Sequence, residues 1–318
     1  MKKLKKSVVL LIPYFGTLPD YFDLWLRSAE SNPEFDFFIY TDAQINVRTN
    51  SNIKIFQTSF EAFRERFYQK LGRNIKLNTP YKLCDYKPAY GYVLEKNIRG
   101  FDFWGFCDID LILGNVSRFI TPDKLDTYDK LYSHGHFCLM KNTDKMNALF
   151  LERYDRVLDH KYAFSTNYCC HFDENGTIFW AGEQDASLRV YKAWDFADTP
   201  YDSYELKCGG RCCAVWYNGN LILMRPDGTR KDIMYIHLQK RKMKKCADLF
   251  DKAVLIIRDE FHSCQSADDF LIPEYDQKSE MAFDERVKEI RREMVFKNIS
   301  DGALRFRINA AVKRWKKW

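Results

Sequence analysis

The first third of the chain alternates between short apolar runs and amphipathic stretches. Unbroken apolar runs, which are typical of strands buried on both faces of a parallel sheet, lie at 7–12, 35–40, 53–57 and 102–107. Helix-like patterns lie between them, over 18–31, 59–70 and 82–96. Strands that alternate with helices predict a doubly wound α/β domain with a mostly parallel sheet.

Beyond residue 115 the pattern is less regular. Residues 128–132 and 137–140 are expected to form short strands, and 213–224 predicts a hairpin that turns at 218–220. Helices are expected over 144–159, after a glycine-containing turn in 180–190, and through most of the chain from 240 onwards. We therefore expect an α/β domain over 1–245 and a helical, basic C-terminal extension over 246–318.

Composition and charge narrow the class of protein. Hydrophobic residues make up 46% and charged residues 30% of the 318, which is ordinary for a globular protein and excludes disordered and collagen-like chains. Eleven Lys and Arg against four acids give 285–318 a net charge of +7, so the other 284 residues carry a net charge of −1. A neutral body with one basic appendage argues against nucleic acid as a partner, because a nucleic-acid-binding domain would itself carry a basic face.

The N-terminus and the cysteines favour a cytoplasmic location. The start resembles a signal peptide, but its apolar run covers only 8–12, Pro13 follows, and no small-residue cleavage site is present, so we interpret it as a buried strand. No stretch approaches the roughly 18–20 apolar residues that span a bilayer. Ten cysteines at scattered spacings are unlike a secreted disulfide scaffold and favour thiols in a reducing compartment.

Candidate chemistry begins with Asp108 and Asp110. They directly follow the apolar run 102–107 and are expected at the carboxyl end of a strand, where open α/β sheets bind their ligands. Proteins hold Mg²⁺ and Mn²⁺ with one or two carboxylates together with phosphate oxygens. From the residues alone, two interpretations stay open: a metal site that clamps a diphosphate, or two solvated acids in a turn.

Two other functions fit the same pair of acids. A haloacid-type phosphatase places an Asp-x-Asp pair after a strand and uses the first Asp as its nucleophile. That pattern has Thr or Val two residues after the second Asp, where this chain has Ile112, and it usually lies at the first strand. The alternatives are therefore a metal-dependent phosphohydrolase and a catalytically inactive glycan- or membrane-binding protein with the same fold.

A set of short segments occurs in a distinctive order along residues 7–245. They are IPYFG (12–16), FFIYTD (37–42), PYKLCDYKPAYGYV (80–93), FWGFCDIDLILGN (103–115), GHFCLMKNT (135–143), WAGEQDASL (180–188) and YIHLQKRKM (235–243). Together they resemble GT-A fold, nucleotide-sugar-dependent glycosyltransferases, in particular a little-characterised bacterial family found with capsule and surface-polysaccharide genes. The resemblance implies a Rossmann-like, mixed and mostly parallel sheet flanked by helices. It also implies a nucleotide-sugar donor, a glycan or lipid-linked glycan acceptor, Mn²⁺ or Mg²⁺, and a role in capsular polysaccharide or lipopolysaccharide synthesis.

Carried over by position, the resemblance assigns a metal site and a donor site. Asp108 and Asp110 would hold the metal on the donor diphosphate, and His237 would complete its shell. The other donor-binding positions would be Pro13, Tyr14 and Phe15 beside the nucleobase, Thr41 and Asp42 beside the nucleoside, Lys82, Asp85 and Lys87 near the sugar and phosphate, and Lys240 near the diphosphate. From the residues alone, Lys82 and Asp85 also fit an ordinary ion pair on the protein surface, along one helix face.

The resemblance also suggests an acceptor side. Glu183-Gln184-Asp185 resembles the acidic triplet that lies below the acceptor in related enzymes. Asp185, or else Glu183, would act as general base and give inversion, or would stabilise an oxocarbenium-like state during retention. Gln184 and His136 would contact the acceptor. A structural role for the acids also stays open, because the helix dipole favours acidic residues near a helix N-terminus.

The last sixteen residues carry an amphipathic pattern. Apolar residues recur on one helical stripe over 303–318, with Lys and Arg at the positions between them. This pattern favours either binding to an anionic membrane surface or docking of the stripe on the protein's own domain. In the first case the enzyme would be peripheral on the inner face of the cell membrane.

Overall fold

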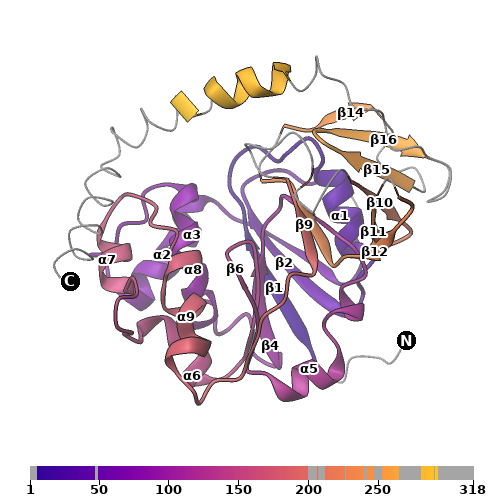
Figure 1. The fold of residues 1–318 in the computed structure, drawn as a ribbon. Coiled ribbons are helices and arrows are strands. Elements are labelled where there is room, and N and C mark those ends of the chain that lie inside the picture. The colour runs from indigo at the N-terminus through magenta and orange to yellow at the C-terminus, as the bar shows by residue number, and fades with distance from the viewer. Residues whose placement is uncertain are drawn as a thin grey trace, which may run out of the picture.

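The computed structural model of the chain describes residues 6–46, 49–199, 206, 212–225, 227–239, 242–246, 253–264, 281–289 and 291–292. Its centre is a seven-stranded sheet in the order β3-β2-β1-β4-β7-β6-β8. Figure 1 shows β1, β2, β4 and β6 of this sheet in the middle of the molecule. The strands are β1 (Val8–Pro13), β2 (Phe35–Thr41), β3 (Ile53–Gln57), β4 (Phe103–Cys107), β6 (Lys130–His134), β7 (Phe137–Lys141) and β8 (Val190–Tyr191). The first four strands pair in parallel, and β7 is antiparallel to both β4 and β6, so the expected mixed, mostly parallel α/β sheet is confirmed.

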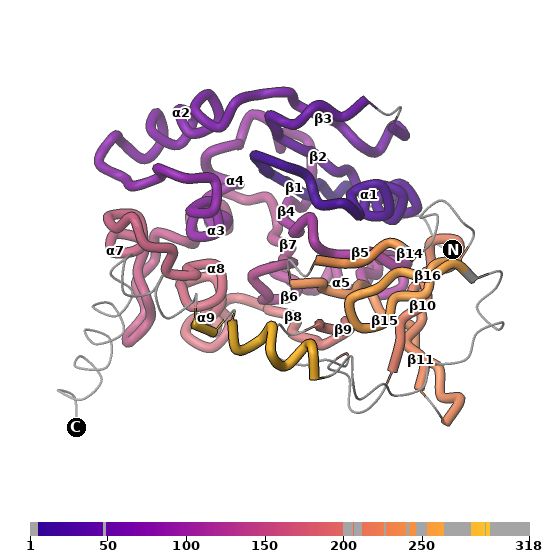
Figure 2. Tube along the Cα trace, turned by 90° about the horizontal axis from the view of Figure 1, so that it is seen from above, coloured from indigo at the N-terminus to yellow at the C-terminus, as the bar shows by residue number. Residues whose placement is uncertain are grey.

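Helices cover both faces of this sheet, and β1 shows why its sequence is an unbroken apolar run. Helix α1 (Phe22–Glu30) and helix α2 (Phe60–Leu71) lie on opposite sides of the sheet (Figure 2). The even-numbered residues of β1 pack in the core with α1, whereas its odd-numbered residues pack in the core with α2. Successive side chains of a strand point to opposite faces, so a strand buried on both faces needs apolar residues throughout. The remaining α-helices are α3 (Leu83–Tyr86), α4 (Tyr90–Val93), α5 (Pro122–Thr127), α6 (Asp144–Asn147), α7 (His160–Ser165), α8 (Phe172–Asn175) and α9 (Thr177–Gln184).

Three expected helices differ in the structure. The segment 82–96 is divided into short helical pieces around Pro88, because proline lacks an N–H and clashes with the preceding turn. The helix expected over 144–159 ends after a 3₁₀ turn at Leu149–Leu151, where the polar and largely exposed stretch 152–156 offers no face to bury. In 180–190 the helix precedes the turn, because Asp185 ends α9 by accepting a hydrogen bond from the backbone N–H of Ser187 at 2.9 Å.

The structure has strands at 244–246, 253–257 and 260–264, so the expectation of a mainly helical chain from 240 onwards is wrong for these residues. The expected hairpin is present as β10 (Cys213–Tyr217) and β11 (Asn220–Met224), and it belongs to a six-stranded sheet in the order β12-β11-β10-β15-β16-β14. The additional strands are β12 (Arg230–Asp232), β14 (Lys244–Cys246), β15 (Ala253–Ile257) and β16 (Glu260–Cys264). The apolar, β-branched run of β15 suits a strand. The expected boundary at 245 falls within β14, and the division into an α/β domain and a C-terminal extension stays a prediction; a helix is described over 281–289 in the expected extension.

Three further expectations concern membrane-spanning helices, the cysteines and the basic C-terminal segment. Within the described ranges, no helix is both long and apolar enough to cross a membrane. Cys212 is disulfide-bonded, which contradicts the expectation of thiols throughout, because spacing along a chain does not show which sulfur atoms meet in space. The basic segment 303–318, on which the membrane interpretation rests, lies outside the described residues.

Candidate functional site

A cavity of about 600 Å³ opens at the carboxyl ends of β1 and β4. Its volume lies within the range of small-molecule sites, roughly 300–1,000 Å³, and its position is the one at which open α/β sheets bind ligands. Its lining includes Pro13, Tyr14 and Phe15 after β1, Asp108 and Asp110 after β4, Asp20, Tyr81, Cys84 and Lys87, and Lys242 and Met243. The structure therefore brings the loops after β1 and β4 together, as the sequence predicts.

Asp110 meets His237 because two short strands pair. β5 (Leu111–Leu113) directly follows the acids and runs antiparallel to β13 (Tyr235–His237), with Leu111 opposite His237. The carbonyl oxygen of Asp110 also accepts a hydrogen bond from the backbone N–H of Leu238 at 2.8 Å. This register places Oδ2 of Asp110 3.7 Å from Nε2 of His237. Two residues that are far apart in the sequence thus stand side by side, with Asp110 in the lining of the cavity and His237 next to it, outside that lining.

A third strand supplies a partner behind His237. β9 (Phe196–Asp198) pairs in parallel with β13 and puts Asp198 opposite His237, with 3.2 Å between Oδ1 and Nδ1. The side-chain amide of Gln239 donates to both oxygens of Asp198 at 2.8 Å. Burial by itself lowers the pKa of His237, but the carboxylates of Asp198 and Asp110 raise it overall. A carboxylate behind an imidazole orients the ring, as it does behind histidine ligands of metals. Sequence reasoning missed Asp198 and Gln239, since only strand register brings them here.

Asp108 is held by a buried lysine. Nζ of Lys87 lies 2.6 Å from Oδ1 of Asp108 and 3.2 Å from Oδ2 of Asp173, and it donates to the carbonyl oxygen of Gly135 at 2.6 Å. Burial lowers the pKa of Lys87, but the negative charges of Asp108 and Asp173 raise it by more. The pKa of Lys87 therefore lies well above its ordinary value. Lys87 is therefore a cation in the cavity wall that also orients Asp108, and its expected contact with the donor stays a prediction.

Sequence reasoning missed Asp173. It lies on α8, is only 4% exposed, and its Oδ1 has no hydrogen-bond partner in the part of the chain that the structure describes. Burial raises the pKa of this carboxyl well above its ordinary value, although Lys87 opposes that shift. Perturbed carboxyls of this kind cluster at functional sites. The sequence around Asp173 contains no motif that indicates a functional residue. Only its contact with Lys87 in the structure identifies it as part of the site.

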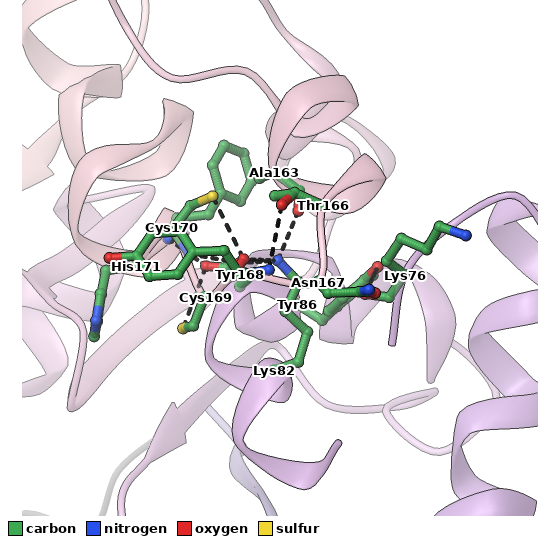
Figure 3. A network of polar contacts seen from close by, with 12 residues as sticks. Lys76, Lys82, Tyr86, Ala163, Thr166, Asn167, Tyr168, Cys169, Cys170 and His171 are labelled. Atoms are coloured by element: carbon green, nitrogen blue, oxygen red, sulfur yellow. Dashed lines mark hydrogen bonds and ion pairs between the residues drawn. The ribbon is translucent and has the colours of Figure 1, made fainter. Parts of the chain in front are cut away.

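The structure does not bring Lys82 and Asp85 to the cavity. Nζ of Lys82 lies 2.5 Å from Oδ2 of Asp85 and donates to the carbonyl oxygens of Ala163 and Tyr168 (Figure 3). Asp85 in turn accepts backbone N–H bonds from the segment 170–172 at 2.8 and 2.9 Å. Both side chains are buried. The two residues form an ion pair, but the expectation of a surface pair is wrong, because the buried pair connects α3 to the segment 163–172.

The other expected donor residues divide into two groups. Pro13, Tyr14 and Phe15 line the cavity. Thr41 and Asp42 do not: the Thr41 hydroxyl accepts from the backbone N–H of Ala43 at 3.1 Å, and Oδ1 of Asp42 accepts from that of Gly16 at 2.8 Å. These two residues shape the loops behind the cavity. Lys240 lies outside the described residues, whereas Lys242, which sequence reasoning missed, lines the cavity.

The acidic triplet lies away from the cavity. Glu183 pairs with Lys192 at 2.5 Å, and Asp185 pairs with Lys145 at 3.4 Å while it ends α9. Gln184 between them is exposed. None of the three lines the cavity.

We therefore expect the Asp185→Asn and Glu183→Gln variants to keep turnover close to that of the wild type, because neither side chain lines the cavity. Turnover of nucleotide sugar and the melting temperature, measured for each variant, check this. The Asp110→Asn variant is the control that should lose turnover. A loss of about a hundredfold or more in Asp185→Asn at an unchanged melting temperature would instead make Asp185 catalytic.

His136, the expected acceptor contact, lies behind His237. The two rings stack at 4.2 Å between centroids, and Nε2 of His136 lies 2.9 Å from the hydroxyl of Tyr235. Burial, and then the neighbouring His237 and His134, hold the pKa of His136 well below its ordinary value. A neutral, buried ring in this place supports His237 and does not line the cavity.

The distance between Asp110 Oδ2 and His237 Nε2 can be compared with the spacing of two ligand atoms around a divalent ion. Two ligand atoms, each about 2.1 Å from one ion, lie roughly 3–4 Å apart, and Asp110 Oδ2 and His237 Nε2 at 3.7 Å match that spacing. Across the described residues no group of three or more His, Cys, Asp and Glu side chains forms a complete metal site. Mg²⁺ sites that use substrate phosphates need only one or two carboxylates from the protein. Asp110 and His237 therefore fit a site that the substrate completes.

One family profile and several solved structures match the chain. The profile of a family of unknown function (DUF6625) matches residues 10–265. No curated protein matches the sequence significantly. Among solved structures, the galactosyltransferase LgtC in complex with donor and acceptor sugar analogues aligns over 60% of this chain and 75% of its own, at 12% identity and a TM-score of 0.37. The glycosyltransferase GlyE of Streptococcus pneumoniae aligns over 60% of this chain and 46% of its own, at 12% identity and a TM-score of 0.26.

Proposed function

The chain belongs to the DUF6625 family, and we propose that it is a metal-dependent glycosyltransferase that moves a sugar from a nucleotide-sugar donor to a glycan acceptor. The observation that supports this most is that Asp110, which lines a cavity of about 600 Å³, lies 3.7 Å from His237. A carboxylate and an imidazole suit Mn²⁺, and a carboxylate with phosphate oxygens suits Mg²⁺.

The charges in the cavity suit a nucleoside diphosphate. Lys87 and Lys242 supply positive charge, but Asp108 and Asp110 lie in the same wall. A diphosphate beside two carboxylates would be repelled unless a cation lay between them, and a divalent ion at Asp110 and His237 would meet that need. The aromatic rings of Tyr14, Phe15 and Tyr81 give the cavity flat apolar surfaces against which a nucleobase can pack.

The proposed reaction exchanges one bond at the anomeric carbon. The bond from that carbon to the diphosphate oxygen breaks and its electron pair stays on the diphosphate, while an acceptor oxygen bonds the carbon and its proton passes to the leaving diphosphate or to water. A divalent ion bound by Asp110 and His237 supplies charge neutralisation for the leaving diphosphate. Lys87 holds Asp108 in the cavity wall and, with Lys242, adds positive charge on the leaving-group side.

The biological setting is part of the same proposal. The segments that resemble capsule-associated glycosyltransferases support a glycan or lipid-linked glycan as the acceptor and a bacterial surface polysaccharide as the product. The basic pattern of 303–318 supports a peripheral position on the inner face of the cell membrane.

Thermal stabilisation by donors tests the proposal. We expect UDP-, GDP-, CMP- or dTDP-sugars of one nucleotide class to raise the melting temperature with Mn²⁺ present, and EDTA to remove the effect. A ligand at about 100 times its dissociation constant adds about 2.7 kcal/mol, which such a measurement detects. Release of inorganic phosphate from the nucleotide sugar without an acceptor would favour the phosphohydrolase alternative. Stabilisation by none of these donors would contradict the proposal.

A further inference from the structure

One large aromatic side chain is exposed close to the site. Trp194 is 75% exposed, although tryptophan side chains are highly buried on average. Its ring is nevertheless held in place, since it stacks on Phe196 with 5.4 Å between ring centroids and lies 5.0 Å from the ring of His134. One side of the indole is therefore packed against the protein while most of its surface remains accessible.

The backbone on both sides of Trp194 is anchored as well. The carbonyl oxygen of Ala193 lies 3.0 Å from Nε2 of His134, and Oδ2 of Asp195 accepts a hydrogen bond from the Tyr132 hydroxyl at 3.0 Å. The carbonyl oxygen of Asp195 also accepts from the backbone N–H of Met234. Trp194 is thus presented on a fixed support, and a fixed binding group loses less entropy when a ligand binds.

Ring contacts connect Trp194 with the candidate metal ligands. His134, beside Trp194, stacks on His136 with 5.3 Å between centroids and 5° between planes. His136 in turn stacks on His237, which stands next to Asp110. Phe196 forms a second route, because its ring lies 5.4 Å from Trp194 and 5.0 Å from His136. We call these five rings, Trp194, His134, Phe196, His136 and His237, the aromatic row.

We propose that Trp194 is a stacking platform for a sugar of the acceptor glycan, one or more units away from the sugar that reacts. This inference rests on the proposed function. A reacting hydroxyl would lie near Asp110 and His237 at one end of the aromatic row, and Trp194 lies three ring-to-ring steps away at the other end. The apolar face of a pyranose packs on an indole, and its hydroxyls can bond to polar groups around the ring. The site would therefore select an oligosaccharide over a monosaccharide.

The surroundings of Trp194 favour a sugar over other occupants. The donor cavity has its own aromatic rings and Trp194 does not line it, which argues against the donor's nucleobase. The neighbours of Trp194 are His134 and Asp195 as well as Phe196, so the ring lies among polar groups and not in an extended apolar patch of the kind that marks a lipid surface.

Binding of free glycans to the full-length protein tests this inference. The probes are an array of mono- to tetrasaccharides, followed by titration with the oligosaccharides that bind. We expect the wild type to prefer an oligosaccharide to its monosaccharide, and Trp194→Ala to weaken that binding about tenfold or more. Trp194→Phe should keep most of the affinity. Trp180→Ala, which removes another exposed indole on α9, is the matched control and should bind as the wild type does.

Two results would overturn the inference: Trp194→Ala binding the same oligosaccharides as tightly as the wild type, or the wild type binding no glycan on the array. In a transfer assay, the KM for the oligosaccharide should rise in Trp194→Ala while kcat and the donor KM stay unchanged. Donor stabilisation separates this inference from the proposed function. If glycan binding depends on Trp194 but no donor binds, the result would support the sugar site and contradict the proposed glycosyltransferase activity.

Discussion

Replacement of Asp110 with asparagine is expected to remove metal-dependent donor binding and to lower turnover by about 10²–10³-fold, the usual loss when one group that stabilises transition-state charge is removed. The neutral amide is a poorer ligand for Mg²⁺ or Mn²⁺ than the carboxylate, and the substitution also removes one of the two carboxylates beside His237. The fold should persist, because the backbone carbonyl of residue 110 still accepts from Leu238. The melting temperature with donor and Mn²⁺ or EDTA, together with turnover, measures the effect.

A second acid in the same cavity provides the matched control. Asp20 also lines the cavity but is exposed, and we place it outside the metal site. Asp20→Asn should therefore keep the metal-dependent rise in melting temperature. Equal metal dependence in Asp110→Asn and the wild type would remove Asp110 from the metal site, and a loss in both variants would point to the total negative charge of the cavity.

The local pattern of the sequence carries enough information to predict the strands that build the cavity. β1 and β4 are unbroken apolar runs because both of their faces are buried, and a run of that kind indicates a central strand. Chain connectivity alone then places Asp108 and Asp110 at the end of a strand. The family resemblance is not needed for these two acids, but it is needed for His237, whose own neighbourhood has no distinctive pattern.

The rest of the site depends on contacts between distant segments, which a local pattern does not encode. Asp198 and His237 face each other because β9 and β13 pair in one register, and a shift of one residue in either strand would turn its side chain to the other face. Asp173 reaches Lys87 only through the packing of α8. Spacing along the chain correctly indicates that Lys82 and Asp85 share a helix face, but it cannot show that the segment 163–172 covers them.

Replacement of Lys82 with methionine is expected to have the largest effect on stability, a loss of roughly 3–5 kcal/mol, which is typical when one partner of a buried ion pair is removed. Methionine fills a similar volume, but it leaves the Asp85 carboxylate buried without its cation and the carbonyl oxygens of Ala163 and Tyr168 without their donor. Proteins are stable by only about 5–15 kcal/mol, so the loss is a large fraction of the total. Denaturant unfolding of the full-length protein measures it.

An exposed ion pair with a similar N–O distance separates the effect of burial on stability from the effect of charge. Lys70 and Glu95 lie 2.7 Å apart at the surface, and Lys70→Met should change stability little, because water screens exposed ion pairs. At a temperature where Lys82→Met remains folded, it should still bind the donor that stabilises the wild type, since Lys82 does not line the cavity. If Lys82→Met has normal stability but no longer binds the donor, Lys82 would be a donor-binding residue. If Lys82→Met were as stable as Lys70→Met and bound donor normally, the buried network would contribute nothing to the fold.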